Sequence, residues 1–208
     1  MTTIAKGGNL PIDAATVRAQ LSWGPGPAGP DVDGSALLLR GDGRVASDDD
    51  FVFFNQPRHP SGAVRHAGKA GTTDTVEVDL AGLPGDVERV VLAASADGGT
   101  FGQVPGLRLV ISDAATGAAL AEFVIAAQTE TALVSGELYR REGRWKFRAV
   151  GQGYASGLAG LATDFGISVD EPAPAPIVTP PDFVPAPPPP GFVPPPFPGP
   201  LPPGAMPR

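Results

Sequence analysis

The chain has 208 residues, with 15 Lys and Arg against 22 Asp and Glu, a formal net charge of -7 at pH 7, and no cysteine. The lack of cysteine excludes disulfide bonds, thiolate metal sites and cysteine nucleophiles. The acidic balance argues against a nucleic-acid binder, because phosphate contacts need basic surface. No apolar run reaches the roughly 18 residues of a transmembrane span, and residues 1–11 lack the pattern of a secretion signal, so we expect a cytoplasmic location.

Proline is distributed unevenly, and this divides the chain. Residues 171–208 contain 18 of the 26 prolines. Proline lacks the backbone donor and fixes φ, so this segment cannot add to a packed core. We therefore predict one folded domain over residues 1–170 and a disordered proline-rich tail over residues 171–208. The tail is interpreted as a spacer or, alternatively, as a docking segment for protein partners, since Pro185 and Pro188 have P-x-x-P spacing.

Within the first 170 residues the apolar positions recur with a period of two, which is typical of strands with one buried face. The first such face comprises Val17, Ala19, Leu21 and Trp23. An apolar run at residues 35–39 is followed by the turn sequence 40–43, and we expect the chain to return as a strand from Val45. Further strands are expected at residues 51–54, 76–80 and 88–94.

Two more hairpins follow, each with a glycine in its turn. Residues 107–111 pair with 120–125, and residues 132–139 pair with 145–150 around Glu142-Gly143. One short helix is expected at residues 156–164. With about nine or ten strands, the sequence predicts an all-β fold, a two-sheet antiparallel β-sandwich with one short C-terminal helix.

Two pairs of aspartates are the clearest candidates for a functional site. In an extended segment, residues i and i+2 point to the same side about 6.5 to 7 Å apart, so Asp31 with Asp33, and Asp48 with Asp50, each form a carboxylate pair. If the pairs converge they need a cation between them, and Ca²⁺ suits such a set because it takes roughly 6 to 8 oxygen ligands. Asn55 adds a neutral oxygen nearby. The alternative is that these aspartates are solvated turn and edge residues.

Signals for catalysis are weak. The usual phosphate-binding, serine-hydrolase and zinc-protease motifs are absent. Only His59 and His66 are available for a histidine-based triad, and His66 is expected to be an exposed strand residue. Paired carboxylates leave a glycosidase-type hydrolase as an alternative. A basic stripe on one strand face, expected to contact solvent or else an anionic partner or membrane surface, comprises Arg144, Lys146 and Arg148.

The motifs taken together resemble the TerD family of bacterial tellurium-resistance and stress-response proteins. The resemblance rests on residues 6–10, 31–38, 47–56, 101–104 and 136–153, in the expected order. It implies a two-sheet β-sandwich that binds Ca²⁺ through acidic loops, has no known catalysis and takes part in resistance to tellurite and other stresses. Family ligand positions match Asp31, Asp33, Asp48, Asp50 and Asn55.

One departure from the family pattern is expected to weaken calcium binding. Where the family carries an acidic segment after the strand histidine, this chain has residues 66–75 with Lys69, and only Asp74 is left to supply a carboxylate. A lysine there repels a cation and removes a ligand. Two hypotheses follow: a non-enzymatic Ca²⁺-binding stress-response protein with weakened metal binding, or a metal-free adaptor that recruits partners through residues 171–208 and the basic strand face.

Overall fold

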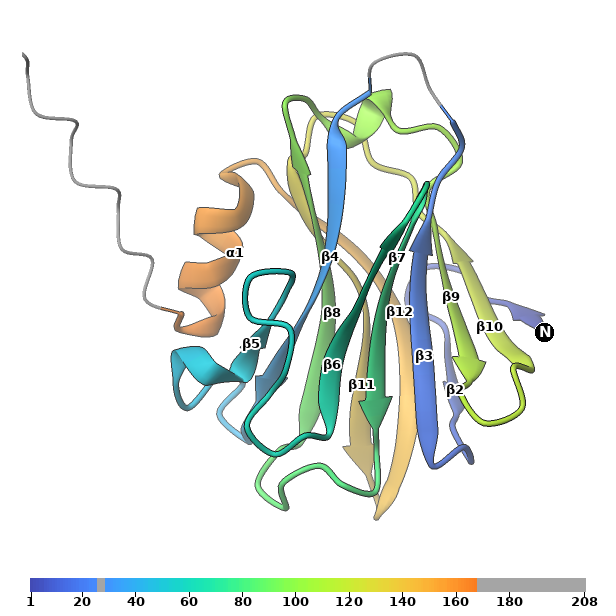
Figure 1. Ribbon diagram of the computed structural model, residues 1–208, viewed down its shortest axis with the longest axis vertical. Coiled ribbons are helices and arrows are strands. Elements are labelled where there is room, and N and C mark those ends of the chain that lie inside the picture. The colour runs from blue at the N-terminus through green and yellow to red at the C-terminus, as the bar shows by residue number, and fades with distance from the viewer. Residues whose placement is uncertain (26–28, 168–208) are drawn as a thin grey trace, which may run out of the picture. The chain divides into compact units, whose positions relative to one another are not determined.

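A computed structural model describes residues 1–25 and 29–167, in which two six-stranded sheets pack face to face (Figure 1). The two-sheet β-sandwich expected from the sequence is confirmed. The proline-rich tail expected at residues 171–208 lies outside the described residues.

Sheet A has the strand order β1-β10-β9-β3-β7-β6. Its strands span Thr2–Thr3 (β1), Ala119–Val124 (β10), Arg108–Asp113 (β9), Thr16–Ser22 (β3), Thr73–Asp79 (β7) and Val64–Ala70 (β6). Sheet B has the order β2-β12-β11-β8-β4-β5. Its strands span Asn9–Pro11 (β2), Arg144–Tyr154 (β12), Ala132–Arg141 (β11), Arg89–Asp97 (β8), Asp31–Leu39 (β4) and Phe51–Val52 (β5). All neighbouring strands are antiparallel except β1 and β10.

Two of the three hairpins expected from the sequence are present. β9 returns as β10, and β11 returns as β12. The turn between β11 and β12 places Glu142 at φ 54° and Gly143 at φ 74°. Positive φ at both central residues is the geometry that lets a two-residue turn follow the twist of its strands.

The prediction that the chain returns as a strand from Val45 is wrong. The turn forms, because the Gly43 N–H donates to the Arg40 carbonyl (2.9 Å), but the Val45 N–H then donates to the Phe165 carbonyl (3.0 Å). The chain therefore leaves β4 and runs to the C-terminal helix. β4 pairs instead with β8 along its whole length and with the short β5 at one end.

The main core lies between the sheets and is formed by the inward-facing residue of each alternating pair. Its largest fully buried side chains include Phe101, Phe147, Ile111 and Leu138. Complete burial of such a side chain stabilises the fold by roughly 1.5–3 kcal/mol. Val32 of β4 and Val76 of β7 belong to this core, so it holds the strands that carry Asp31, Asp33 and Asp74 in place.

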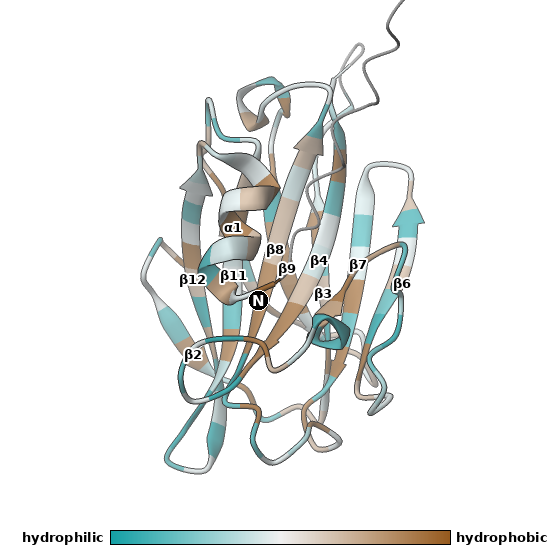
Figure 2. Ribbon diagram, turned by 90° about the vertical axis from the view of Figure 1, so that its left-hand side faces the viewer, coloured by the Kyte–Doolittle hydropathy of each residue, from teal (hydrophilic) through white to brown (hydrophobic). Residues whose placement is uncertain are grey.

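A second apolar cluster lies on the outer face of sheet B, under helix α1 (Gly157–Phe165) (Figure 2). Leu161 of the helix packs there with Leu37, Leu39, Val91 and Val134. The helix expected at residues 156–164 is thus confirmed to within one residue. Among the described residues no helix is long and apolar enough to cross a membrane.

Candidate metal site

Asp31 and Asp33 begin β4 and project to one side of the strand, as their spacing predicts. β5 pairs with β4 only at Ala36 and Leu37. Among the described residues, the first part of β4 therefore has a neighbouring strand, β8, on one side and none on the other. This unpaired edge packs against β6 and β7 of sheet A. The acidic pair therefore lies where the two sheets approach each other.

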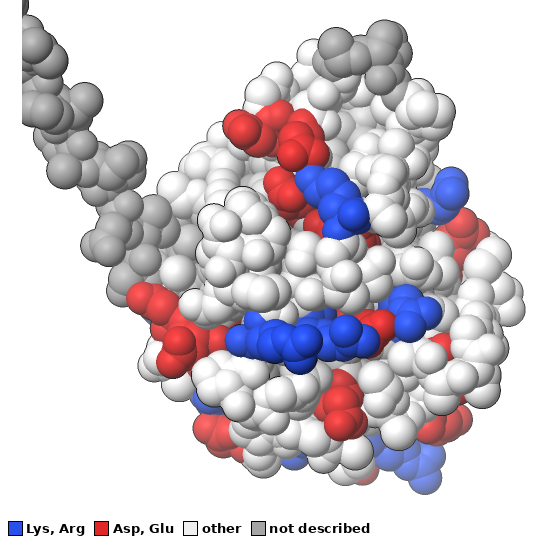
Figure 3. All heavy atoms as spheres, viewed as in Figure 1, with Lys and Arg blue, Asp and Glu red and all other residues white. Residues whose placement is uncertain are grey.

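Lys69 of β6 crosses from sheet A to this acidic pair. Its Nζ lies 2.6 Å from Oδ1 of Asp31 and 2.8 Å from Oδ1 of Asp33. Partial burial acts to lower the pKa of the Lys69 ammonium, but the hydrogen bonds to the two carboxylates outweigh it and raise that pKa above its ordinary value. Lys69 is therefore charged at neutral pH. Figure 3 shows Lys and Arg side chains lying directly against Asp and Glu on this face of the molecule.

Asp74 of β7 lies in the interior beside the same edge. Its Oδ2 accepts the Gly34 N–H (2.7 Å), a donor of the unpaired β4 edge, and its Oδ1 accepts the Thr75 N–H (2.8 Å). His66 Nε2 lies 2.8 Å from Oδ1 of Asp74, and the His66 side chain is 6% exposed. The expectation that His66 is exposed is wrong, because β6 turns this side chain inward to the buried carboxylate.

Asp50 occupies a different place from Asp31 and Asp33. Residues Asp48–Asp50 form one turn of 3-10 helix rather than a strand, so they do not project as an i, i+2 pair. Oδ2 of Asp50 accepts the Ala46 N–H (2.7 Å) and the Ser47 N–H (3.2 Å). Its Oδ1 lies 3.2 Å from Nη1 of Arg40 and 3.0 Å from Nε2 of His59.

This environment sets the charge of Asp50. Burial acts to raise the pKa of the carboxyl, but the hydrogen bonds from Ala46, His59 and Ser47 and the nearby Arg40 charge together hold that pKa below its ordinary value. Both oxygens are used to pin the 3-10 turn and the side chains of Arg40 and His59. The carboxylate stabilises the fold at this point.

Of the remaining two predicted ligands, Asp48 belongs to the 3-10 turn itself and Asn55 lies five residues after its end. The Asp48 carbonyl accepts a hydrogen bond from Nε2 of Gln56 (2.9 Å). Asn55 is exposed at the tip of a two-residue turn, between Phe53 and Gln56, whose backbones exchange two hydrogen bonds of 3.1 Å. Asp48 and Asn55 are thus exposed residues on two separate turns.

The six predicted ligands therefore fall into three groups: the pair Asp31 and Asp33, the buried Asp74, and the region of Asp48, Asp50 and Asn55. Within residues 1–25 and 29–167, no three His, Asp or Glu side chains are grouped so that they could hold a metal ion. Ca²⁺ takes roughly 6 to 8 oxygens. The group that comes nearest offers two carboxylates with an ammonium between them, and this does not fit a calcium ion.

The residues that contact the predicted ligands could be predicted only in part from the sequence. Lys69 stands out because it replaces an acid in a recognisable motif. The contacts of Asp50 with Arg40 and His59, and of Asp74 with His66, carry no such signal, because they depend on how the strands and the 3-10 turn are placed in space. A buried histidine beside a buried aspartate is visible only in the fold.

Comparison with known proteins agrees with this architecture. The TerD domain family matches residues 1–165. Tellurium resistance protein TerD of Serratia marcescens is 37% identical over 187 residues, covering 80% of this chain and 97% of that protein. General stress protein 16U of Bacillus subtilis (strain 168) is 37% identical over 152 residues, covering 67% of this chain and 79% of that protein.

Solved structures show the same fold. The crystal structure of a Streptomyces coelicolor A3(2) homologue of telluride resistance protein (TerD) has a TM-score of 0.60 at 22% identity, covering 74% of this chain and 98% of that chain. The order of motifs, the sandwich and the family match lead to one assignment. The chain belongs to the TerD domain family.

Proposed function

We propose that this chain is a non-enzymatic stress-response protein of the tellurium-resistance type in which the Lys69 ammonium takes the place of a bound Ca²⁺. The observation that carries the proposal is the pair of contacts from Lys69 Nζ to Asp31 and Asp33, 2.6 and 2.8 Å. A charge held at this position repels a second cation and occupies the oxygens that would bind it. Calcium binding is therefore weakened, and the charge of the Asp31 and Asp33 pair is partly compensated without metal.

The names of the relatives support the resistance role. The Serratia protein is named for tellurium resistance, and the Bacillus protein for general stress. The family match covers nearly all of the described part of this chain, including both sheets. We extend the role in tellurite and stress resistance to this chain on that basis. A cytoplasmic location is part of the proposal and can be checked by cell fractionation.

The arrangement of the carboxylates favours binding over catalysis. A glycosidase needs two carboxyl groups that face one substrate, one as acid and the other as base or nucleophile. Here both Asp31 and Asp33 are engaged by the Lys69 ammonium, and Asp50 receives hydrogen bonds at both oxygens. These contacts leave no acid–base pair among the predicted residues, which argues against the hydrolase alternative.

The proposal makes two measurements decisive. In a tellurite-sensitive bacterium, expression of the full chain should raise the tellurite concentration that permits growth, compared with empty vector. In calorimetry, calcium at micromolar concentration should give no binding heat and no rise in melting temperature, because a ligand that binds only the native state must raise its stability. Equal growth with and without the protein would overturn the resistance role, and tight calcium binding would overturn the role of Lys69.

The alternative of a metal-free adaptor, which recruits partners through residues 171–208 and the basic strand face, remains a prediction. Its tail, residues 171–208, lies outside the described part of the chain. Its basic strand face is partly neutralised, because Arg148 contacts Glu137. Affinity capture with the full chain and with residues 1–170 tests it: partners bound equally by both would remove the tail from the proposal.

A further inference from the structure

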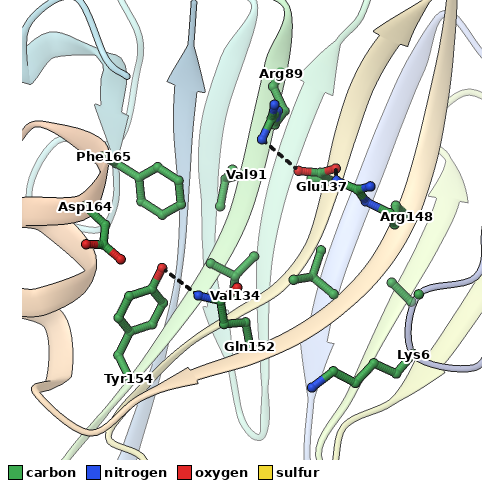
Figure 4. Close-up of a pocket in the computed structure, with 13 residues that line it drawn as sticks. Lys6, Arg89, Val91, Val134, Glu137, Arg148, Gln152, Tyr154, Asp164 and Phe165 are labelled. Atoms are coloured by element: carbon green, nitrogen blue, oxygen red, sulfur yellow. Dashed lines mark hydrogen bonds and ion pairs between the residues drawn. The ribbon is translucent and has the colours of Figure 1, made fainter. Parts of the chain in front are cut away.

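A cavity of about 600 Å³ opens on the outer face of sheet B, beside the end of α1 (Figure 4). It is distinct from the Asp31 and Asp33 edge, and the residues of that edge do not line it. β8, β11 and β12 form its floor, which is apolar and includes Val91, Val134 and Val150. The floor continues the second apolar cluster where α1 does not cover it.

One side of the cavity is cationic. Glu137, whose side chain is 5% exposed, is contacted by Arg148 at one carboxylate oxygen and approached by Arg89 Nη1 at the other (3.6 Å). The side chains of Arg89 and Arg148 remain 41% and 45% exposed, and a single carboxylate cannot neutralise both. Lys6 also lines the cavity, but its ammonium lies apart from the two arginines (Figure 4), where Nζ donates to the Gly151 carbonyl (2.8 Å).

The opposite side is formed by the end of α1 and by β12. Phe165 presents a ring, while Asp164 and Tyr154 present polar atoms (Figure 4). Burial, with the nearby Asp164 carboxylate, raises the pKa of Tyr154 to about 12, so its hydroxyl stays neutral. Gln152 Nε2 donates to that hydroxyl (3.2 Å). The cavity thus has a cationic side, an apolar floor and a hydrogen-bonding side.

We propose that this cavity binds a small organic anion, in which a carboxylate or phosphate group is carried on an apolar body. The oxyanion faces Arg89 and Arg148, since guanidinium groups bind planar oxyanions through paired charge-assisted hydrogen bonds. The apolar body lies on the valine floor beside Phe165. With three cationic and two anionic side chains in the lining, the cavity has a net charge of +1 although the whole chain carries -7.

The protein contains a matched arrangement that serves as a control. On sheet A, Arg18 and Arg65 share the carboxylate of Glu77, in the same way that Arg89 and Arg148 share Glu137. Neither Arg18 nor Arg65 lines the cavity. If two arginines around a glutamate sufficed to bind an anion, the two sites would behave alike. The proposal requires that only the site with the cavity does so.

The test uses calorimetry on the full chain with three probes: phenyl phosphate, phenylacetate and inorganic phosphate. We expect one or both phenyl compounds to bind at millimolar concentration or tighter, and inorganic phosphate to bind at least about tenfold more weakly, since it lacks the apolar body. The phenyl compound that binds better identifies phosphate or carboxylate as the preferred group. No binding of either phenyl compound would overturn the proposal.

Variants then assign the site. Arg89→Gln should weaken binding at least about tenfold, the equivalent of one charge-assisted hydrogen bond, while Arg148 still contacts Glu137. Arg65→Gln should leave the affinity unchanged. If Arg89→Gln lowers the melting temperature strongly, Phe165→Ala tests the apolar contact instead and should also weaken binding. Equal effects of Arg89→Gln and Arg65→Gln would show that the cavity is not the site.

Discussion

The Nζ atom of Lys69 lies 2.6 Å from Oδ1 of Asp31, and this contact joins β6 of sheet A to β4 of sheet B. Together with the Gly34 N–H, which donates to Asp74 of β7, it connects the two sheets where β4 lacks a strand partner on one side. A cation attached to the chain is always present at one equivalent. On the function proposed above, this lysine supplies the positive charge at the edge that a bound Ca²⁺ would otherwise supply.

Replacement of Lys69 by aspartate should increase calcium affinity. Lys69→Asp removes the internal cation and adds a third carboxylate beside Asp31 and Asp33, which moves the site toward the oxygen set that Ca²⁺ prefers. Calorimetry on the full chain should show a calcium heat that the natural chain lacks, together with a calcium-dependent rise in melting temperature.

Lys69→Gln is the matched control for this change, because it removes the charge without adding a carboxylate. Its calcium affinity should stay below that of Lys69→Asp. Its free energy of unfolding should fall by about 1 kcal/mol or less, since Asp31 is 69% exposed and solvent screens such a pair. A calcium affinity of Lys69→Asp no higher than that of Lys69→Gln would contradict this account of the edge.

Asp50 should make the stability sensitive to acid. Its folded-state pKa is lowered below 3.8, so its contribution is fully present above the unfolded-state pKa and is lost as the pH falls through 3.8 toward the folded-state value. Asp50→Asn should lower the free energy of unfolding at pH 7 by about 1–3 kcal/mol, the cost of weakening buried charge-assisted hydrogen bonds. Urea unfolding at a series of pH values measures both effects.

The difference between Asp50→Asn and the natural chain should narrow as the pH decreases, because the natural carboxyl is then protonated as well. Asp49→Asn is a suitable control, since Asp49 is an exposed neighbour on the same 3-10 turn. A difference that stays constant between neutral and strongly acidic pH would show that the ionisation of Asp50 contributes nothing to stability.

The attachment of helix α1 should depend on one leucine. Leu161 is fully buried against the outer face of sheet B, whereas Leu158 of the same helix is 41% exposed. Leu161→Ala should lower the free energy of unfolding by about 2–5 kcal/mol, and Leu158→Ala by much less. Denaturant unfolding compares the two substitutions directly. Equal losses would mean that α1 is not anchored through Leu161.

Local sequence patterns predicted those parts of the fold that depend on neighbouring residues. The turn at Glu142-Gly143 and the same-side pair Asp31 and Asp33 follow from local geometry, and both are present. The strand expected from Val45 failed because its N–H bonds to Phe165, a partner far along the chain. No local pattern indicates such a contact.

In the candidate site, too, local geometry could be predicted from the sequence, whereas contacts between distant residues could not. The spacing of Asp48 and Asp50 suggests a second carboxylate pair only if the segment is extended, and it forms a 3-10 turn instead. The capping-box geometry from Ser47 and Asp50, with the long-range contact to His59, stabilises that turn. The charge at Lys69 was visible in the sequence, whereas its distance from Asp31 depends on the packing of two sheets.

Gly136 should be intolerant of any side chain. It lies at the register shift between β11 and β12, and a Cβ atom there would come within 2.6 Å of Cε2 of Phe147 and 3.0 Å of the Arg148 carbonyl oxygen. Phe147 is fully buried, so its ring cannot move away without disturbing the core. Gly136→Ala should therefore lower the free energy of unfolding by about 1–3 kcal/mol, as overpacking does.

Gly41→Ala provides the control, because no heavy atom lies within 4 Å of a Cβ placed there and its backbone does not require glycine. Its free energy of unfolding should change by no more than about 0.5 kcal/mol. Denaturant unfolding of both variants compares the same chemical change in a packed and an open environment. If Gly136→Ala were as stable as Gly41→Ala, the close packing of Phe147 and Arg148 against Gly136 would not restrict this position, and this prediction would be wrong.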